Sequence, residues 1–310
     1  MPLAERSKEK TAFISSEGLF EFNRLPFGLK TAPGLFQNIM DDILREFKND
    51  FAMAYIDDVI VYSKTFDEHL SHLEQIFMKF RKNDIQAKPS KCNFAKPRVP
   101  LLGHIVTKDG ILVDPEKVEV IEKLKPPTTV KEVRRFIGML SYYRKFIGNF
   151  SEVAEPLINL TKKNVKFEWN DSCQKAFEIL KDRITRAPIL IHPDNSKSYI
   201  LQTDASDFSV GAVLLQTCGE YNKPVLFLSH KMNEAQRKYT AMEREAYAII
   251  YALKKLRNYL YGTKFTILTD HKPLLSLFSK QINNARIQRW AVIMSEFDFD
   301  IAYTKGKSNF

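Results

Sequence analysis

Apolar residues recur at intervals of three and four over 67–82, and this period predicts an amphipathic helix. The recurring positions are Leu70, Leu73, Ile76, Phe77 and Phe80. We expect the side that carries Leu70, Leu73 and Phe77 to pack on the core. His69 and His72 then lie on the outer side of the helix, where we expect surface residues and not a metal site.

The last third of the chain alternates between strand-like and helix-like patterns. The predicted elements are strands at 199–203, 210–216 and 225–229, a long helix at 234–260, a strand at 265–269, a helix near 273–278 and a strand around 297–303. This order predicts an α/β or α+β domain. Upstream, Thr129 and Glu132 form a capping-box pattern that opens another helix.

Composition indicates a globular chain with two domains. The chain has 310 residues, 44% of them hydrophobic and 27% charged, which excludes global disorder. Proline-containing joints occur at Pro126-Pro127, at Pro188 and at 193–196, and the last is the best candidate for a domain boundary.

The net charge suggests the kind of partner, and the cysteines suggest the cellular compartment. With 47 basic and 37 acidic residues the formal charge is +10, for which a polyanion such as a nucleic acid is a natural partner. The three cysteines form no disulfide or zinc pattern, so we expect an intracellular protein, cytoplasmic or nuclear. No uninterrupted apolar stretch approaches 18 residues, so we expect no membrane partner.

Two adjacent aspartates stand between apolar, strand-forming runs over 51–63. The pattern predicts a β-hairpin with Asp57 and Asp58 at its tip. An ordinary turn is the simplest interpretation, since aspartate favours turns. The apolar flanks instead suggest that the acids lie at the end of a buried sheet, where their oxygens would suit Mg²⁺.

About ten motifs, the hairpin among them, agree in their order with a known family. Tyr55-Ile56-Asp57-Asp58 resembles the Y-x-D-D motif of reverse transcriptases, and the chain as a whole resembles the Pol polyproteins of gypsy-type long-terminal-repeat retrotransposons. The other motifs include 25–33, Leu101-Leu102-Gly103-His104, Tyr142-Tyr143-Arg144-Lys145-Phe146, Phe167-x-Trp169 and Thr203-Asp204-Ala205-Ser206.

The resemblance implies a mixed α+β or α/β architecture with three parts. These are a partial polymerase palm at 1–112, a thumb and connection at 113–193, and an RNase H-like domain at 194–310. The implied activities are RNA-directed DNA synthesis by two-metal nucleotidyl transfer and degradation of the RNA strand of RNA/DNA hybrids. The implied partners are primer and template nucleic acid, RNA/DNA hybrid and dNTPs.

The resemblance also assigns residues to the polymerase. Asp57 and Asp58 would bind two Mg²⁺ ions, with Mn²⁺ as an alternative. The remaining assignments are Gly28, Lys30 and Gln37 on the nucleotide and template side, and Leu102 and Gly103 in the hairpin that grips the primer. Gln37 fits equally well as a plain polar residue of a helix.

Three acids of the last domain would lie at one site if the domain has an RNase H fold. Asp204 and Asp270 end predicted strands, and the helix between them carries Glu243 and Glu245. The helical register does not choose between the glutamates, but the family pattern E-x-x-A-I selects Glu245. Asp204, Glu245 and Asp270 would then bind two metal ions and catalyse hydrolysis, with Glu243 beside the site or at the surface. His271 has a structural and a functional interpretation of equal weight.

The resemblance is incomplete at both ends of the sequence. The family has a palm aspartate upstream of the stretch that resembles 10–13, and an acid of the RNase H tetrad downstream of 303–309. We therefore expect a fragment truncated at both ends, with one acid of each centre outside it. The alternative is a catalytically inactive, retroelement-derived protein that binds nucleic acid.

Overall fold

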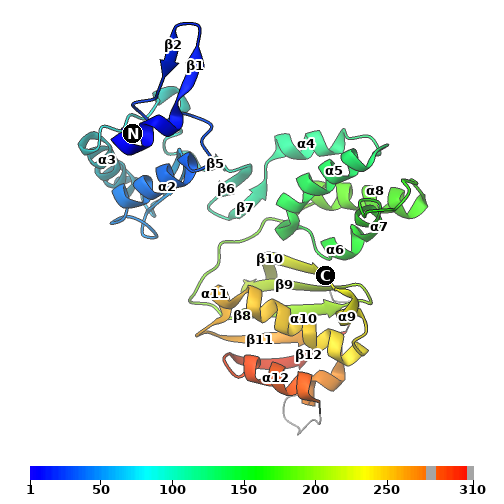
Figure 1. Ribbon diagram of the computed structural model, residues 1–310. Coiled ribbons are helices and arrows are strands. Elements are labelled where there is room, and N and C mark those ends of the chain that lie inside the picture. The colour runs from blue at the N-terminus through cyan, green and yellow to red at the C-terminus, as the bar shows by residue number, and fades with distance from the viewer. Residues whose placement is uncertain (277–283, 306–310) are drawn as a thin grey trace. The chain divides into compact units, whose positions relative to one another are not determined.

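The computed structural model describes residues 1–276 and 284–305, which form two compact units, 1–97 and 98–310 (Figure 1). Both units mix helices and strands, as expected from the sequence. The division into compact units falls between Pro97 and Arg98. It does not test the predicted boundaries at 112/113 and 193/194, which stay predictions. Within the described ranges, no helix is both long and apolar enough to cross a membrane.

The first unit is built from short strands and two main helices. Its elements are α1 (Glu5–Lys8), η1 (Glu9–Thr11), β1 (Phe13–Ser15), β2 (Gly18–Phe20), α2 (Ala32–Ile43), β3 (Ala52–Tyr55), β4 (Asp58–Val61), α3 (Phe66–Lys82) and η2 (Pro89–Lys91). Strands β1 and β2 pair with each other, as do β3 and β4. Helices α2 and α3 and the β3–β4 hairpin share a small core that includes Met40, Phe51, Ile76 and Phe80.

Helix α3 forms where the sequence predicts it, but it packs through a different face. Thr65 caps its N-terminus in a capping box with Glu68. Ile76 and Phe80 are buried, whereas Leu70 and Phe77 are 51% and 41% exposed. The predicted core face was therefore wrong, because the apolar positions of this helix extend around two sides and the hairpin contacts only one of them.

The two histidines consequently face the hairpin. His72 stacks on Phe51, with 3.7 Å between the ring centroids, and both His69 and His72 contact the Ser63 hydroxyl through Nδ1. The expectation that they lie on the outer side of α3 was wrong. They pack against the hairpin, and neither belongs to a cluster of metal-ligand side chains among the described residues.

The second unit begins with a small sheet and a group of helices. Its first elements are β5 (Arg98–Leu101), β6 (His104–Thr107), β7 (Gly110–Val113), α4 (Pro115–Glu122), α5 (Val130–Tyr142), η3 (Arg144–Phe146), α6 (Phe150–Val153), α7 (Glu155–Asn159) and α8 (Asp171–Thr185). Thr129 caps α5 by accepting from the backbone N–H of Glu132, as the sequence predicts, but the Glu132 carboxylate accepts from the Thr128 backbone N–H in place of the reciprocal bond of a capping box. Gly110, with φ of +143°, lets β7 approach the Leu190 carbonyl, where a Cβ would lie only 2.2 Å away.

A five-stranded sheet completes this unit, in the order β10-β9-β8-β11-β12 (Figure 1). The remaining elements are β8 (Tyr199–Ala205), β9 (Ser209–Cys218), β10 (Tyr221–Lys231), α9 (Glu234–Arg237), α10 (Ala241–Lys255), α11 (Arg257–Leu260), β11 (Lys264–Thr269), η4 (Lys272–Ser276), α12 (Ala285–Met294) and β12 (Asp298–Tyr303). Strands β8, β9 and β10 are antiparallel neighbours, and β11 runs parallel to β8 and β12.

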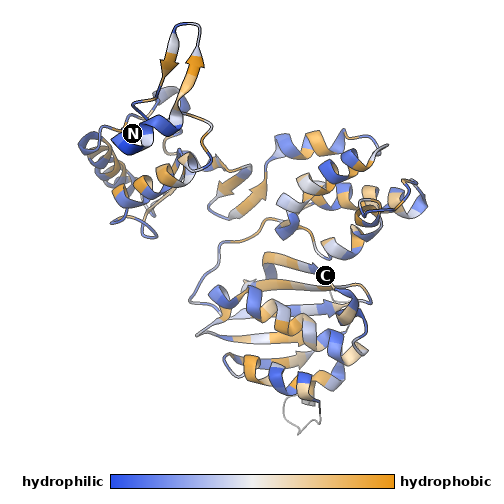
Figure 2. Ribbon diagram, viewed as in Figure 1, coloured by the Kyte–Doolittle hydropathy of each residue, from blue (hydrophilic) through white to orange (hydrophobic). Residues whose placement is uncertain are grey.

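Side chains of the sheet alternate between two cores. Leu201 and Leu214 pack with α10 and α12, whereas Val213 and Leu215 pack with α5 to α8. This alternation follows from the two-residue period of a strand. Hydrophobic residues, orange in Figure 2, accordingly occupy much of the sheet.

Three details differ from the sequence prediction. The single helix expected over 234–260 is three helices, because Thr240 ends the first segment and caps α10 in a capping box with Glu243. Residues 272–276 form a short 3₁₀ helix, and the rest of the predicted 273–278 helix lies outside the described residues. Helix α12 was not predicted, although Ile287, Trp290 and Met294 have helical spacing and are buried.

Candidate functional site

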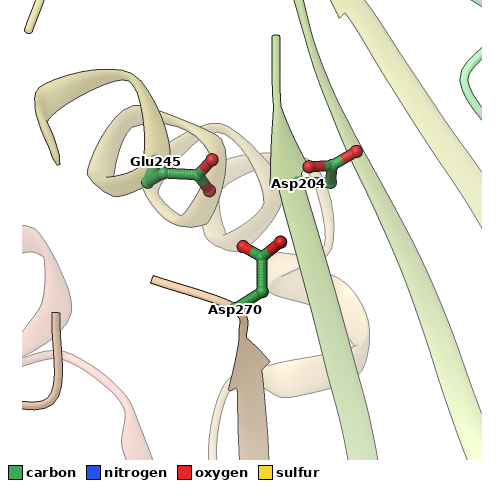
Figure 3. A group of neighbouring side chains, drawn as sticks. All are labelled: Asp204, Glu245 and Asp270. Carbon is green, nitrogen blue, oxygen red and sulfur yellow. The ribbon is translucent and has the colours of Figure 1, made fainter. Parts of the chain in front are cut away.

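Three carboxylates meet at one edge of the large sheet. Asp204 is the penultimate residue of β8, and Asp270 directly follows β11. Because β8 and β11 are parallel neighbours, their carboxyl ends lie at the same edge. Glu245 reaches the same place from the second turn of α10, which packs on β8 and β9. Ligand oxygens of the three residues all lie within 4.8 Å of one another (Figure 3).

The cluster distinguishes Glu245 from Glu243, between which the helical register did not choose. Glu245 joins the acids, whereas Glu243 turns away and caps α10 through Thr240. Glu243 also accepts hydrogen bonds from Asn284 and Arg286, which attach the start of α12. Glu243 is only 7% exposed, so the expectation that it could be a surface residue was wrong.

Burial and neighbouring charge raise the pKa values of Glu245 and Asp204. Burial, followed by the charges of Asp204 and Asp270, raises the pKa of Glu245 to about 8. Burial and the charge of Asp270 also raise the pKa of Asp204, and the Ala205 backbone N–H and the Asn149 side chain partly oppose this. The site therefore stores like-charge repulsion that a cation would relieve.

The donor set fits a divalent metal ion. Oxygen Oε2 of Glu245 is buried and, among the described residues, has no hydrogen-bond partner. Buried carboxylate oxygens normally have partners, so an unpaired one beside two further carboxylates fits a metal ligand. Asp204, Glu245 and Asp270 are also the one group of His, Cys, Asp or Glu side chains with this potential in the described part of the chain.

Asn149 is a neighbour of the site that the sequence did not indicate. It has a left-handed backbone, with φ of +50°, and its side chain lies over Gly211, which pairs with Asp204 across β8 and β9. A Cβ on Gly211 would approach Asn149 Oδ1 to 2.4 Å. Its only sequence signal is a Gly148-Asn149 pair typical of a turn.

The second candidate site is the β3–β4 hairpin of the first unit. Asp57 lies in its turn and Asp58 begins β4, opposite Tyr55. The hairpin is as predicted, but both acids are exposed, so the expectation of a buried sheet end was wrong. The reason is that β3 and β4 pair only with each other in the described structure, which leaves Met53 and Tyr55 51% and 55% exposed.

Gln37 holds this hairpin through its whole side-chain amide. Its Oε1 accepts from the backbone N–H of Ile56 at 2.6 Å, and its Nε2 donates to the Ala54 carbonyl and to Asp41 Oδ1, both at 3.0 Å. Ile56 has φ of +53°, which is rare for a β-branched residue. The bonds from Gln37 stabilise this turn and so present Asp57 and Asp58 at its tip. Contact of Gln37 with a nucleotide stays a prediction.

The other sequence-predicted residues lie in turns and connecting segments, outside the regular helices and strands. Gly28 and Lys30 are exposed in the segment before α2, and Gly28 has φ of +92°, which itself favours glycine there. Leu102 and Gly103 form the turn between β5 and β6, in the second unit. His271 is half-buried, and its backbone N–H bonds the Thr269 hydroxyl.

Two protein families match this chain, one in each of two regions. Residues 1–106 match the family described as reverse transcriptase (RNA-dependent DNA polymerase). Residues 194–297 match the RNase H-like domain found in reverse transcriptase.

Relatives extend the match over almost the whole chain. The chain is 42% identical over 306 residues to the retrovirus-related Pol polyprotein from transposon 297 of Drosophila melanogaster, covering 98% of the chain and 28% of the relative. It is 36% identical over 321 residues to that from transposon gypsy of the same organism, covering 99% of the chain and 31% of the relative. The chain thus spans less than a third of the length of these relatives.

A solved structure has the same fold. A foamy viral protease-reverse transcriptase in complex with double-stranded DNA superimposes with a TM-score of 0.84 at 23% identity, over 100% of this chain and 55% of that one. The order of the two regions, the fold and the relatives agree with the resemblance seen in the sequence. The chain therefore carries a reverse transcriptase region followed by the RNase H-like domain found in reverse transcriptases, and its relatives are the retrovirus-related Pol polyproteins of transposons.

Proposed function

We propose that the second unit hydrolyses the RNA strand of RNA/DNA hybrids at Asp204, Glu245 and Asp270. The observation that carries this proposal is the convergence of three carboxylates within 4.8 Å, one of them with a buried, unpaired oxygen. Acids on a strand, a helix and a neighbouring strand end are the arrangement a metal-dependent phosphodiester hydrolase needs.

Magnesium is the ion we propose, two per site, with Mn²⁺ as a substitute. When bound, such ions activate a water and stabilise the charge on the leaving oxygen. The protein's part is to hold the oxygens rigidly. Asp204 lies in the paired strand β8 and Asp270 directly follows the paired strand β11. Glu245 is held by helix α10, which is capped by Thr240 and packs through a buried face.

The proposed ligand is a nucleic acid duplex. The formal charge of +10 supports a polyanionic partner, and the foamy viral relative of this fold was solved with double-stranded DNA. Contacts of this kind are made with phosphates and weaken as salt rises.

The test is cleavage of an RNA/DNA hybrid labelled on the RNA strand, with the purified chain and Mg²⁺ or Mn²⁺. Asp204→Asn should abolish cleavage. The matched control is Asp300→Asn, an exposed acid of β12 that pairs with Lys264, and it should cleave like the parent. Hybrid binding without cleavage in the parent would instead support the alternative of a catalytically inactive binding protein.

We also infer a polymerase role for the first unit, with primer, template and dNTPs as its ligands. The observation in favour is the hairpin itself: Gln37 fixes a left-handed turn that presents Asp57 and Asp58 to solvent, where a primer terminus and metal ions can reach them. Gly28 and Lys30 would face the incoming nucleotide. Leu102 and Gly103, which belong to the second unit, would contact the primer.

Primer extension on an RNA template tests this role. Extension by the parent chain that is lost in Asp57→Asn, and kept in Asp67→Asn on the exposed start of α3, would support it. Absence of extension alongside intact hybrid cleavage would restrict the catalytic function of this chain to the RNase H centre.

A further inference from the structure

The turn between β5 and β6 has an unusual backbone held by side chains from another element. Leu102 and Gly103 have φ of +47° and +68°, so both central residues are left-handed. A leucine in this conformation is strained, and it persists only where surrounding contacts determine it.

The contacts come from two tyrosines at the end of α5. The Tyr142 hydroxyl donates to the Leu102 carbonyl, and the Tyr143 hydroxyl donates to the Gly103 carbonyl at 3.0 Å. Tyr143 is 6% exposed, and a Cβ on Gly103 would lie 3.2 Å from its hydroxyl. Both carbonyls of the turn are thus bonded to consecutive side chains of one helix end.

His104 completes the arrangement. Its ring packs against Tyr142, Tyr143 and Phe146, with centroid distances of 5.3, 5.4 and 5.6 Å. Its Nδ1 contacts the Leu102 carbonyl at 2.8 Å, which assigns the proton to Nδ1 because a carbonyl only accepts. The turn is therefore attached to α5 by aromatic packing as well as by hydroxyl bonds.

The chain that follows the tyrosines bonds the sheet that carries the carboxylates. The Arg144 guanidinium donates to the Ser229 carbonyl of β10, and the Ser151 backbone N–H donates to the Ser229 hydroxyl at 2.7 Å. Phe146 and Ile147, between them, are each 1% exposed. One short segment, 142–151, therefore contacts the β5–β6 turn at its start and the β10 strand at its end.

We propose that Tyr142 and Tyr143 are positioning residues that fix the β5–β6 turn relative to the Asp204, Glu245 and Asp270 centre. The proposal rests on the proposed function: a duplex that contacts the turn is then held in one register, and its RNA strand is cut at a set distance from the primer end. The tyrosines do not touch the reacting atoms. They act through the backbone of Leu102 and Gly103.

Hydrogen exchange tests the attachment without requiring activity. In the double variant Y142F/Y143F, which keeps both rings and removes both hydroxyls, peptides over 99–106 should exchange about tenfold faster, because local opening loses two hydrogen bonds. Peptides from β8 should be unchanged. Tyr221→Phe is the control, since Tyr221 is 71% exposed on β10. Exchange over 99–106 equal to that of the parent would overturn the proposal.

The positions of the cuts in the RNA strand test whether the tyrosines set the register of the duplex. The substrate is an RNA annealed to a shorter DNA with a recessed 3′ end, and the readout is the distance of each RNA cut from that end. The parent and Tyr221→Phe should cut within a narrow range, and Y142F/Y143F should spread the cuts over at least twice as many positions. An unchanged pattern would overturn the positioning role. A parent that cuts no hybrid would refute the proposed function, and the exchange result would still decide whether the hydroxyls hold the turn.

Discussion

Replacing Glu245 with glutamine should make the protein more stable at high pH. Glu245 is 9% exposed and lies beside Asp204 and Asp270, and burial followed by these charges raises its pKa from 4.5 to about 8. In the folded protein without metal the carboxyl keeps its proton until about pH 8, whereas in the unfolded chain it ionises near pH 4.5. Ionisation therefore favours the unfolded state, and the free energy of unfolding falls as pH rises between these two values.

The size of this effect follows from the shift. At about 1.4 kcal/mol for each pH unit, the loss of stability reaches about 5 kcal/mol as an upper value above pH 8. Glutamine resembles the protonated acid and does not ionise, so Glu245→Gln escapes this loss. For a unit of about 200 residues, this corresponds to a gap in melting temperature of about 10 °C at pH 9.

Thermal unfolding in EDTA from pH 5 to pH 9 measures the gap. We expect the parent and Glu245→Gln to melt together near pH 5 and to diverge as pH rises, with the variant more stable. Mg²⁺ should then raise the melting temperature of the parent more than that of the variant, because it binds the ionised carboxylate. Parallel melting curves across the pH range would refute the reasoning about burial and charge at this site.

Two further changes probe the framework of the candidate sites. Gln37→Leu should cost about 1–3 kcal/mol, since it removes the hydrogen bonds from α2 to the β3–β4 turn; a urea midpoint equal to that of the control Gln86→Leu, at an exposed glutamine after α3, would contradict this. Gly110→Ala should cost more than about 2 kcal/mol, because its Cβ would meet the Leu190 carbonyl at 2.2 Å and its φ is +143°. Gly262→Ala, which shares a positive φ but has open space, should cost less in the same thermal unfolding measurement.

Local patterns predicted several elements because their information lies in adjacent residues. The helix start at Thr129, the hairpin around Asp57 and the strands over 199–229 and 265–269 rest on spacing and turn chemistry, and the structure confirms them. Helix α12 was missed although Ile287, Trp290 and Met294 have helical spacing, since a ten-residue helix offers a short pattern beside the longer predicted elements.

Burial was the weaker inference, because it depends on which partner an element meets. Helix α3 has apolar residues on two sides, and its own periodicity does not say which side the hairpin covers. The exposure of Asp57 and Asp58 has the same origin, since apolar flanking residues do not reveal how many strands join the sheet.

The sequence by itself determined the motifs, their order and the family, since these depend only on residue types and spacing. The tertiary structure decided how the residues meet. The sequence of the helix alone leaves Glu243 and Glu245 equivalent. The packing of α10 on β8 places Glu245 beside Asp204, whereas Glu243 accepts hydrogen bonds from Thr240 and Arg286. The tertiary structure likewise joined Tyr142 to Leu102, forty positions away. Contacts between residues distant in sequence form only when folding closes the loops between them, and no local pattern records that closure.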